Sequence, residues 1–478
     1  MENPSTPMKP KKNSALIAVI AVVVVVVIVG SFIGIDYNHL FPKKVTTVTP
    51  TPTPSNQVLY VYPGVSGPAN SNHLLGGCVL AEMKGAAVPA ASAQLMAYLL
   101  NPAIQKACEA ATGFIPVDQG AYTSSPSTTV PTIYSPHNAT VTVYYYSSIS
   151  TADVSYVTSV LNNFHTAYPN INVEPSFITA TNIVSDISSL VTANSHANVV
   201  MTIDNLDVGT LFYDSYLFNL TSWVNTITSG AQVISSINQL NNYEVSVFGG
   251  TYFLTQLVNV PLVWMDYTAM KKAGITSPPT TYTQLYTDAK TLYTYYNDTG
   301  MINFQGHGGA STPTELYQWM VQFDGNPMVF NDTGDIQAME YIYNLSQYFS
   351  PDYKTSYWAT YTGLASNTYT VMYYQWPGSV NLTKLGMTPY NSTDTALNES
   401  LNALKGGVFL RSPVAWIGEW QDIMDNTVWK VVEDHSGLSS LVSALNSANS
   451  HMDSYLSSLY GSHVAQLYEQ GYYKPVSV

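Results

Sequence analysis

Residues Ser14 to Ile35 form an uncharged, almost wholly aliphatic run near the start of the chain, and Thr46 to Pro54 behind it reads TTVTPTPTP. As a helix rising about 1.5 Å per residue, this run is long enough to cross a hydrocarbon core of about 30 Å. In lipid, an isolated segment satisfies its backbone only as a helix. We therefore expect a short basic leader at 1–13, a transmembrane anchor at 14–35 and a semi-rigid Thr/Pro-rich stalk at 36–57.

The alternative for this run is a cleaved secretory signal. The apolar part of such a signal is shorter, and no small-residue cleavage site follows Ile35 closely. Lysines before the run favour an N-terminus on the inner side of the membrane. The anchor therefore predicts a single-pass protein of the cell membrane whose remaining residues are held outside the cell.

The charge balance limits the class of ligand. Only 10% of the residues are charged, against a usual value of about 25%, and the formal net charge is −14. Nucleic-acid binding needs clusters of Lys and Arg, which the chain lacks; Arg411 is its only arginine. A neutral, hydroxyl-rich ligand fits better than an anion. The same composition suggests a protein adapted to an acidic medium, a hypothesis that a stability curve collapsing below pH 4 would contradict.

The pattern from Ala139 onward alternates strands with helices. Ala139–Tyr146 reads as a strand, Ser150–Asp153 is a capping box before a helix, and Ala197–Ile203 is a later buried strand. Such alternation predicts a parallel α/β sheet, in which ligands bind beyond the carboxyl ends of the strands. Polar residues at such ends are Ser147, Ser148, Asp204 and Asn205.

Motifs for catalysis or metal binding are lacking. The sequence has no Walker-type phosphate loop and no G-x-S-x-G elbow. His435 follows Glu433 and Asp434, but consecutive side chains point in different directions and fit a solvated face better than a metal site. A glycosidase needs two opposed carboxylates, and no pair is singled out. We expect a protein that is not an enzyme and uses no cofactor or metal.

One long segment carries a family resemblance. The stretch VPLVWMDYTAMKKAGITSPPTTYTQLYTDAKTL, at Val260–Leu292, resembles the middle of the family 1 extracellular solute-binding proteins, the sugar-binding subunits of ABC transporters. In it Thr281 and Gln284 form a capping box before a helix of about fourteen residues, and Gly274 suits the position after a helix end. Shorter matches in the family order are PNINVE, NVVMTIDN with LFNLT, FDGN and VMYYQWPGS, which together cover most of Ala139–Ser379.

The resemblance is closest to archaeal membrane-anchored glucose-binding proteins, and the basic leader resembles their class III, pilin-like signals. It implies a two-lobed α/β fold of the periplasmic-binding-protein type (class II-like) with a hinge, at 139–478. A neutral sugar would bind between the lobes and pass to the permease subunits of an ABC transporter. Glucose or a similar monosaccharide is expected, because Thr202 replaces an aromatic residue of some maltose-type relatives. Alternatives are a di- or oligosaccharide such as maltose or trehalose and, in another class, a surface adhesin or structural protein.

Residues 58–122 are out of order by comparison with this family. LLGGCVLAEMKG and TGFIPVDQGAY resemble a segment that the family places after its tryptophan element, whereas here it precedes the first strand. We interpret 58–122 as one displaced strand–helix unit of a lobe, joined to the rest by a linker at 123–138. A partial duplication or a sequence-assembly artefact are the alternatives. Cys78 and Cys108 lie in this block, and we expect a disulfide between them, with two buried thiols as the alternative.

Candidate ligand-binding residues follow from sugar chemistry and from the family positions. Aromatic rings cover the apolar faces of a pyranose, and amides, carboxylates and hydroxyls bond its OH groups. The resemblance makes Trp376 the first stacking candidate and Trp416 the second, with core packing as the alternative for each; Trp264 fits the core or the hinge. Gly76 and Gly77 would let the backbone approach a ligand closely. The remaining candidates are Asp204, Asn205, Ser147, Ser148, Glu315 and Gln318.

Overall fold

The computed structural model describes residues 57–135, 137–146, 151–178, 183–193, 197–297, 300–309, 311–351, 353–354, 372–375, 388–389 and 396–478. The predicted leader, the predicted anchor and the stalk up to residue 56 lie outside these ranges. Within the described ranges, no helix combines the length and the apolar character that a membrane span needs.

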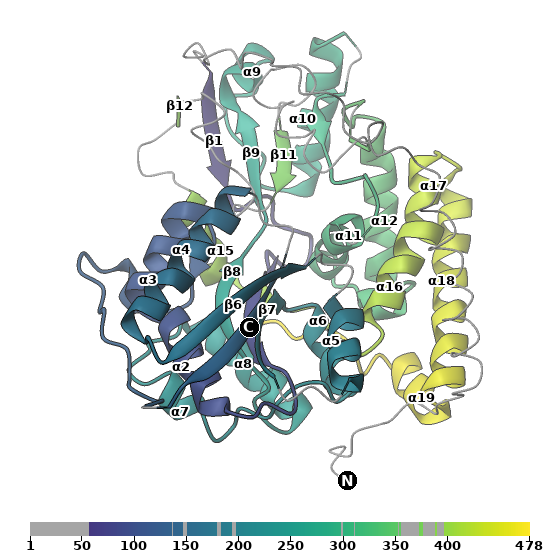
Figure 1. Cartoon of the computed structure of the whole chain (residues 1–478). Helices are drawn as coiled ribbons and strands as arrows, with labels where there is room; N and C mark the ends of the chain where they lie inside the picture. Colours follow the sequence, from purple (N-terminus) through teal and green to yellow (C-terminus); the bar gives the residue numbers. More distant parts are fainter. Residues whose placement is uncertain are drawn as a thin grey trace, which may run out of the picture.

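The first lobe is built on a six-stranded sheet with helices on both faces (Figure 1). The order of its strands is β4 (Ile115–Pro116), β8 (Phe253–Asn259), β3 (Gly76–Glu82), β7 (Asn198–Asp204), β5 (Ala139–Tyr146) and β6 (Ile171–Ile178). Strands β5, β6 and β7 are parallel, as their βα alternation predicts. Strand β3 is antiparallel to both neighbours, so the sheet is mixed.

Two apolar layers cover this sheet because its strands alternate inward and outward residues. Val200 and Leu80 belong to the layer that packs against α2 and α4, whereas Met201 and Val79 belong to the layer on the α5 and α6 side. The helices of the lobe are α2 (Pro89–Leu99), α3 (Pro102–Thr112), α4 (Thr151–Ala167), α5 (Ile183–Thr192), α6 (Asp207–Tyr213), α7 (Val224–Ile227) and α8 (Ser235–Phe248).

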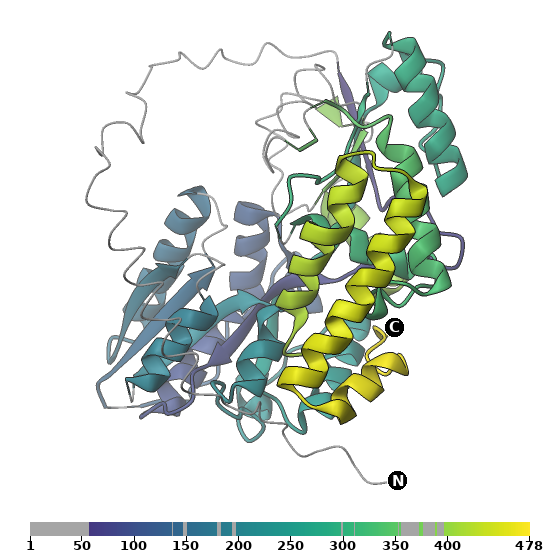
Figure 2. The same cartoon turned by 90° about the vertical axis from the view of Figure 1, so that its right-hand side faces the viewer.

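The second lobe is built on a five-stranded sheet and a larger group of helices, and Figure 2 shows it beside the first lobe. The order of its strands is β10 (Ile302–Asn303), β11 (Met372–Gln375), β9 (Leu262–Asp266), β1 (Val58–Tyr62) and β12 (Thr388–Pro389). Its helices are α9 (Tyr267–Lys272), α10 (Tyr282–Tyr295), α11 (Ser311–Gln322), α12 (Thr333–Ser346), α16 (Ile417–Ile423), α17 (Lys430–Glu433), α18 (Leu438–Leu459) and α19 (Ser462–Glu469). The C-terminal helices pack on α11 and α12 in one apolar core.

The chain passes between the lobes along several adjacent segments. Strand β8 continues through Val260 into β9, and the path from β1 to β3 runs through β2 (His73–Leu74). Strand β2 pairs in parallel with β13 (Val408–Phe409), which links α15 (Ala396–Gly406) to α16. Trp264 is fully buried in the apolar core beside these crossings, in agreement with the expected core or hinge position. These extended segments connect the two lobes.

Residues 58–122 contribute to both lobes. Strand β1 pairs with β9 in the second lobe, whereas β3 lies between β7 and β8 in the first. The block is therefore part of two sheets, whereas the sequence suggested a unit of one lobe. The expected linker packs on α2, where the Gln94 side chain accepts hydrogen bonds from the backbone N–H groups of Ile133 (2.7 Å) and Tyr134 (3.2 Å).

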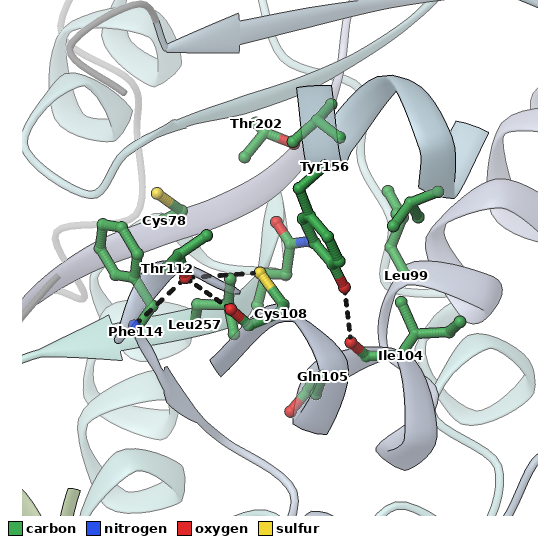
Figure 3. Close-up of a pocket in the computed structure, with 13 residues that line it drawn as sticks. Cys78, Leu99, Ile104, Gln105, Cys108, Thr112, Phe114, Tyr156, Thr202 and Leu257 are labelled. Atoms are coloured by element: carbon green, nitrogen blue, oxygen red, sulfur yellow. Dashed lines mark hydrogen bonds between the residues drawn. The ribbon is translucent and has the colours of Figure 1, made fainter. Parts of the chain in front are cut away.

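The expected disulfide is not formed. Cys78 on β3 and Cys108 on α3 both line one pocket of the first lobe, and no disulfide joins them (Figure 3). Burial raises the pKa of the Cys78 thiol above its ordinary value, so this side chain is a neutral thiol at physiological pH. The Cys108 sulfur lies 3.7 Å from the Thr112 hydroxyl. The alternative of two thiols is the one that this structure adopts.

Candidate functional site

The carboxyl end of β7 lies beside the start of β3, which begins with Gly76 and Gly77. The Asn205 backbone N–H donates to the Gly77 carbonyl (3.0 Å), and the Asn205 side-chain amide donates to the Leu75 carbonyl (3.0 Å). Gly76 pairs with Asn259 on β8. Asp204, Asn205, Gly76 and Gly77, four of the predicted site residues, are therefore brought together at one end of the sheet.

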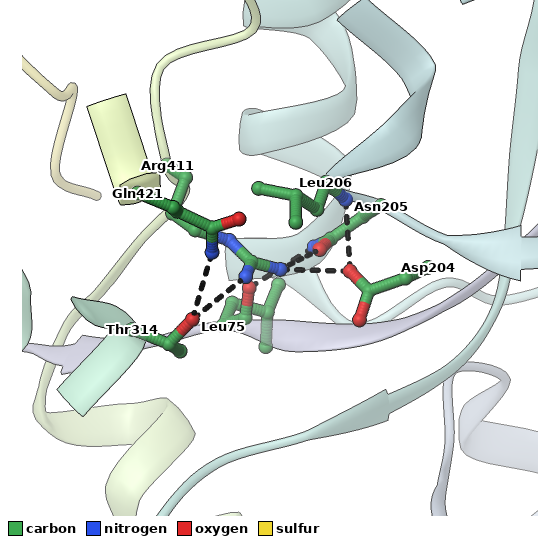
Figure 4. A network of polar contacts seen from close by, with 7 residues as sticks. All are labelled: Leu75, Asp204, Asn205, Leu206, Thr314, Arg411 and Gln421. Carbon is green, nitrogen blue, oxygen red and sulfur yellow. Dashed lines mark hydrogen bonds and ion pairs between the residues drawn. The ribbon is translucent and has the colours of Figure 1, made fainter. Parts of the chain in front are cut away.

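Arg411 joins this sheet end to the second lobe (Figure 4). Its Nη2 donates to Asp204 Oδ1 (2.7 Å) and to Asn205 Oδ1 (2.9 Å), and its Nη1 donates to Thr314 Oγ1 (3.2 Å) on α11. The Gln421 side chain on α16 donates to the same Thr314 oxygen (3.3 Å). We call these five residues the Arg411 network. It connects elements of both lobes around one guanidinium group.

The Arg411–Asp204 ion pair is only partly open to solvent. The Arg411 side chain is 7% exposed and that of Asp204 is 26% exposed. A guanidinium presents several donors in a fixed plane, which suits simultaneous bonding to a carboxylate, an amide and a hydroxyl. Sequence reasoning did not single out Arg411 as a site residue. The sequence feature that could have pointed to it is that Arg411 is the only arginine in the chain.

Two carboxyl groups next to the network hold protons at neutral pH. Burial raises the pKa of Asp207, on α6, to about 8; repulsion by Asp204 adds to the rise and Arg411 opposes it. Burial raises the pKa of Glu244, on α8, to about 8. A protonated carboxyl can donate a hydrogen bond as well as accept one. Asn205, Glu244, Arg411 and Ser412 line a small polar hollow here.

Glu315 and Gln318 lie on α11 inside the second lobe, on the same helix as Thr314 of the Arg411 network. Glu315 Oε2 accepts from the Gln305 backbone N–H (3.1 Å), and burial raises its pKa well above the ordinary value. Gln318 Oε1 accepts from the Leu74 backbone N–H (2.8 Å), which fixes β2 against α11. Both side chains therefore support the second lobe and the hinge.

Trp416 lies in the core of the second lobe. Its side chain is 5% exposed and packs between Tyr460 and Tyr473, with ring centres 5.2 and 4.9 Å away. Its position at the start of α16 is close in sequence to Gln421 of the network. The other stacking candidate, Trp376, lies outside the described residues, as do Ser147 and Ser148. Strand β11 ends at Gln375 and β5 ends at Tyr146, directly before them.

The arrangement offers binding groups and no catalytic set. The Arg411 network has no nucleophile held by a base, and its guanidinium is engaged with acceptors on three residues. In the part of the chain that the structure describes, no group of three or more His, Cys, Asp or Glu side chains could hold a metal ion.

Comparison with solved structures identifies the fold. No protein-family model and no curated protein sequence matches the chain. The sugar-binding protein MalE of Xanthomonas citri superposes with a TM-score of 0.52 at 13% identity, covering 70% of this chain and 100% of that one. Maltose-bound MalE3 of T. maritima gives 0.50 at 12% identity, covering 66% of this chain and 100% of its own.

A third similar structure is the galacto-N-biose/lacto-N-biose I-binding protein of a Bifidobacterium longum ABC transporter, in complex with lacto-N-biose. Its TM-score is 0.50 at 12% identity, with 68% of this chain and 98% of that chain covered. These structures are covered almost completely, and about two thirds of this chain takes part in each match. The chain therefore has the two-lobed α/β fold of the sugar-binding proteins of ABC transporters.

Proposed function

We propose that the protein binds a neutral sugar between its lobes outside the cell and delivers it to the permease of an ABC importer. The observation that carries the proposal is the Arg411 network, which places polar groups of both lobes around the carboxyl end of β7. In open α/β sheets ligands bind at such ends. A sugar that touches both lobes favours the closed state, and closure would present both lobe surfaces to the permease.

The chemistry of the described site fits a hydroxyl-rich, uncharged ligand. Protonated Glu244, which lines the hollow, adds a donor without adding charge at neutral pH. The only guanidinium is already neutralised by Asp204, which disfavours an anionic ligand. Thr202 stands on β7 with a side chain too short for an aromatic platform. We therefore place glucose or a similar hexose first.

A disaccharide is the second candidate, because the similar structures include complexes with maltose and lacto-N-biose. A thermal-shift screen of the full-length protein against glucose, galactose, maltose and trehalose, at pH 4 and pH 7, separates the two. At a hundredfold excess over Kd, a specific ligand stabilises the folded state by about 2.7 kcal/mol. If no neutral sugar raises the midpoint and the protein instead mediates attachment of cells to surfaces, the adhesin alternative holds.

The stacking assignment of Trp376 is tested by calorimetry. Trp376→Ala should weaken sugar binding by about 1–3 kcal/mol, the order of a lost aromatic contact at a binding site. Trp429→Phe is the matched control, because Trp429 is 2% exposed and stacks on Phe304 (5.2 Å between ring centres) in the second-lobe core. It should lower the unfolding midpoint and leave sugar affinity unchanged. Equal affinity of Trp376→Ala and the unmodified protein would refute the assignment.

The membrane attachment is tested by fractionation. With residues 14–35 as the anchor, the full-length protein should sediment with membranes, whereas a chain beginning at Gln57 should stay in the supernatant. The shortened chain should keep its sugar affinity, because its described residues include both sheets and the crossings between them. Recovery of the full-length protein in the supernatant would contradict the anchor.

A further inference from the structure

A second hollow lies inside the first lobe, on the sheet face that α2, α3 and α4 cover (Figure 3). We call it the α3–α4 pocket. Its empty volume, counted out to the solvent at its mouth, is about 630 Å³. Its apolar walls are formed by Leu99, Ile104, Phe114, Val157, Val160 and Leu257.

Three buried polar groups in this pocket have no hydrogen-bond partner among the described residues: Gln105 Nε2, Thr202 Oγ1 and Gln256 Oε1. These residues are 1%, 5% and 6% exposed. The amide orientation of Gln105 is fixed, because its Oε1 accepts from the backbone N–H groups of Val117 (3.0 Å) and Asp118 (3.2 Å). Its NH2 group therefore remains as a donor. A buried polar group without a partner destabilises a fold, and a ligand that bonds to it removes that cost.

A β-bulge places Gln256 in the pocket. The register between β3 and β8 moves from Cys78 opposite Leu257 to Val79 opposite Thr255, so Gln256 is the extra residue. Consecutive strand residues normally point to opposite faces of a sheet. Here Gln256 and Leu257 both line the same pocket. Bulges re-aim side chains in this way next to binding sites.

The pocket suits an uncharged occupant. Its lining includes no Asp, Glu, Lys, Arg or His side chain. The Tyr156 hydroxyl at the wall donates to the Ile104 carbonyl (3.2 Å), and burial keeps the Cys78 thiol protonated. The polar groups without partners comprise one amide donor, one amide acceptor and one hydroxyl. A hydroxyl group on a small apolar body complements such a set, because it both donates and accepts.

We propose that the α3–α4 pocket is a second ligand site, which takes an uncharged, mostly apolar molecule of about one ring that carries a hydroxyl group. The ring would lie against the aliphatic walls, and the hydroxyl would bond to the Gln105 donor and the Gln256 acceptor. All of the lining residues belong to the first lobe, so binding does not require closure of the lobes. The pocket borders the proposed sugar site, because Cys78 in its lining pairs with Asp204 across β3 and β7.

Calorimetry with phenol and toluene tests this site in the full-length protein. Phenol should bind, and Gln256→Leu should weaken phenol about tenfold while leaving toluene, which has no hydroxyl, unchanged. Val160→Phe fills the pocket and should abolish binding of both. Matched controls are Gln239→Leu and Val247→Phe on the exposed face of α8, which should change neither affinity. Thr202→Val, which removes one hydroxyl at constant size, is a second variant that should weaken phenol alone.

Two further readouts separate a ligand site from a structural role. Gln256→Leu should raise the unfolding midpoint, because it removes a buried acceptor without a partner, whereas loss of a structural contact would lower it. Bound phenol should slow the modification of Cys108 by methyl methanethiosulfonate, because Cys108 lines the pocket and is partly exposed. Absence of phenol binding, or equal phenol binding by Val160→Phe, would overturn the proposal.

Discussion

Arg411 shows how much of this site depends on a single side chain. The residue follows β13 in the hinge and reaches Asp204 and Asn205 in one lobe and Thr314 in the other. From the sequence, Asp204 and Asn205 could be placed at a strand end, because the βα pattern before them is local. Their partner could not be identified, because it lies more than 200 residues away.

Arg411→Met should destabilise the protein by about 1–3 kcal/mol, measured by chemical denaturation. Removing one partner of a buried pair costs more, about 3–5 kcal/mol, but the Asp204 side chain is partly exposed and keeps some hydration. The matched control is Lys354→Met, which breaks the exposed ion pair with Glu433 and should change stability by less than about 1 kcal/mol. Arg411→Met and Asp204→Asn should not be additive; additivity would show that the pair does not act as a unit.

At the scale of the elements, local signals predicted helix ends well. Thr281 caps α10 by accepting from the Gln284 backbone N–H (3.2 Å), and the helix has 14 residues, as the capping box predicts. Gly274 has a φ of +84°, in the left-handed region expected after α9. These features depend on three or four neighbouring residues, so the sequence displays them directly.

Gly77 illustrates a requirement that is not local. Its φ is +142°, and a Cβ at this position would lie 2.3 Å from the Leu257 carbonyl oxygen on β8. The glycine is thus required by the approach of a neighbouring strand at the bulge, whereas the sequence suggested approach of a ligand. Whether a ligand also uses this backbone stays a proposal.

Gly77→Ala should lower the free energy of unfolding by about 2–4 kcal/mol, because backbone strain and a clash with β8 add together. Gly274→Ala is the matched control. Its φ is also positive, but no heavy atom lies within 4 Å of the added carbon, so a loss of about 1 kcal/mol is expected. If urea unfolding gave the two variants equal losses in the free energy of unfolding, the clash at Gly77 would have to be relieved by movement of β8.

At the scale of the whole molecule, several carboxyl groups are buried, and the cations near Asp207 and Asp335 do not offset the effect of burial on their pKa values. Burial raises the pKa of Glu244 and Asp207 to about 8 and that of Asp288 to about 6, and it raises the pKa values of Glu82 and Asp335 well above their ordinary range. A group whose pKa is raised on folding makes its full contribution to stability at pH values below the pKa that it has in the unfolded chain. That contribution is lost as pH rises through the folded pKa. The low charge of the sequence and these neutral acids both fit an acidic medium.

The thermal unfolding midpoint should therefore decrease as the pH is raised from 6.5 to 8.5. His73 acts in the opposite sense, because burial lowers its pKa from 6.5 to about 4, but its effect is confined to pH values below about 6.5. Glu244→Gln should make the decrease of the unfolding midpoint smaller, because the glutamine amide does not ionise. Glu469→Gln, at the exposed end of α19, is the control and should leave the decrease unchanged. A midpoint that rises across this pH range would contradict the expectation.

The sequence by itself determined the α/β alternation, the helix ends near Gly274 and Thr281 and the polar strand end at Asp204, because periodicity and capping signals lie in neighbouring residues. The two-lobed form was an implication of the family resemblance. Only the tertiary structure decided that 58–122 supplies strands to both lobes, that Cys78 and Cys108 remain thiols, and that Arg411 joins the lobes. Trp416 and Gln318 likewise proved to pack within the second lobe. Strand pairing and side-chain partnership across hundreds of residues depend on the packing of whole lobes, which no local pattern encodes.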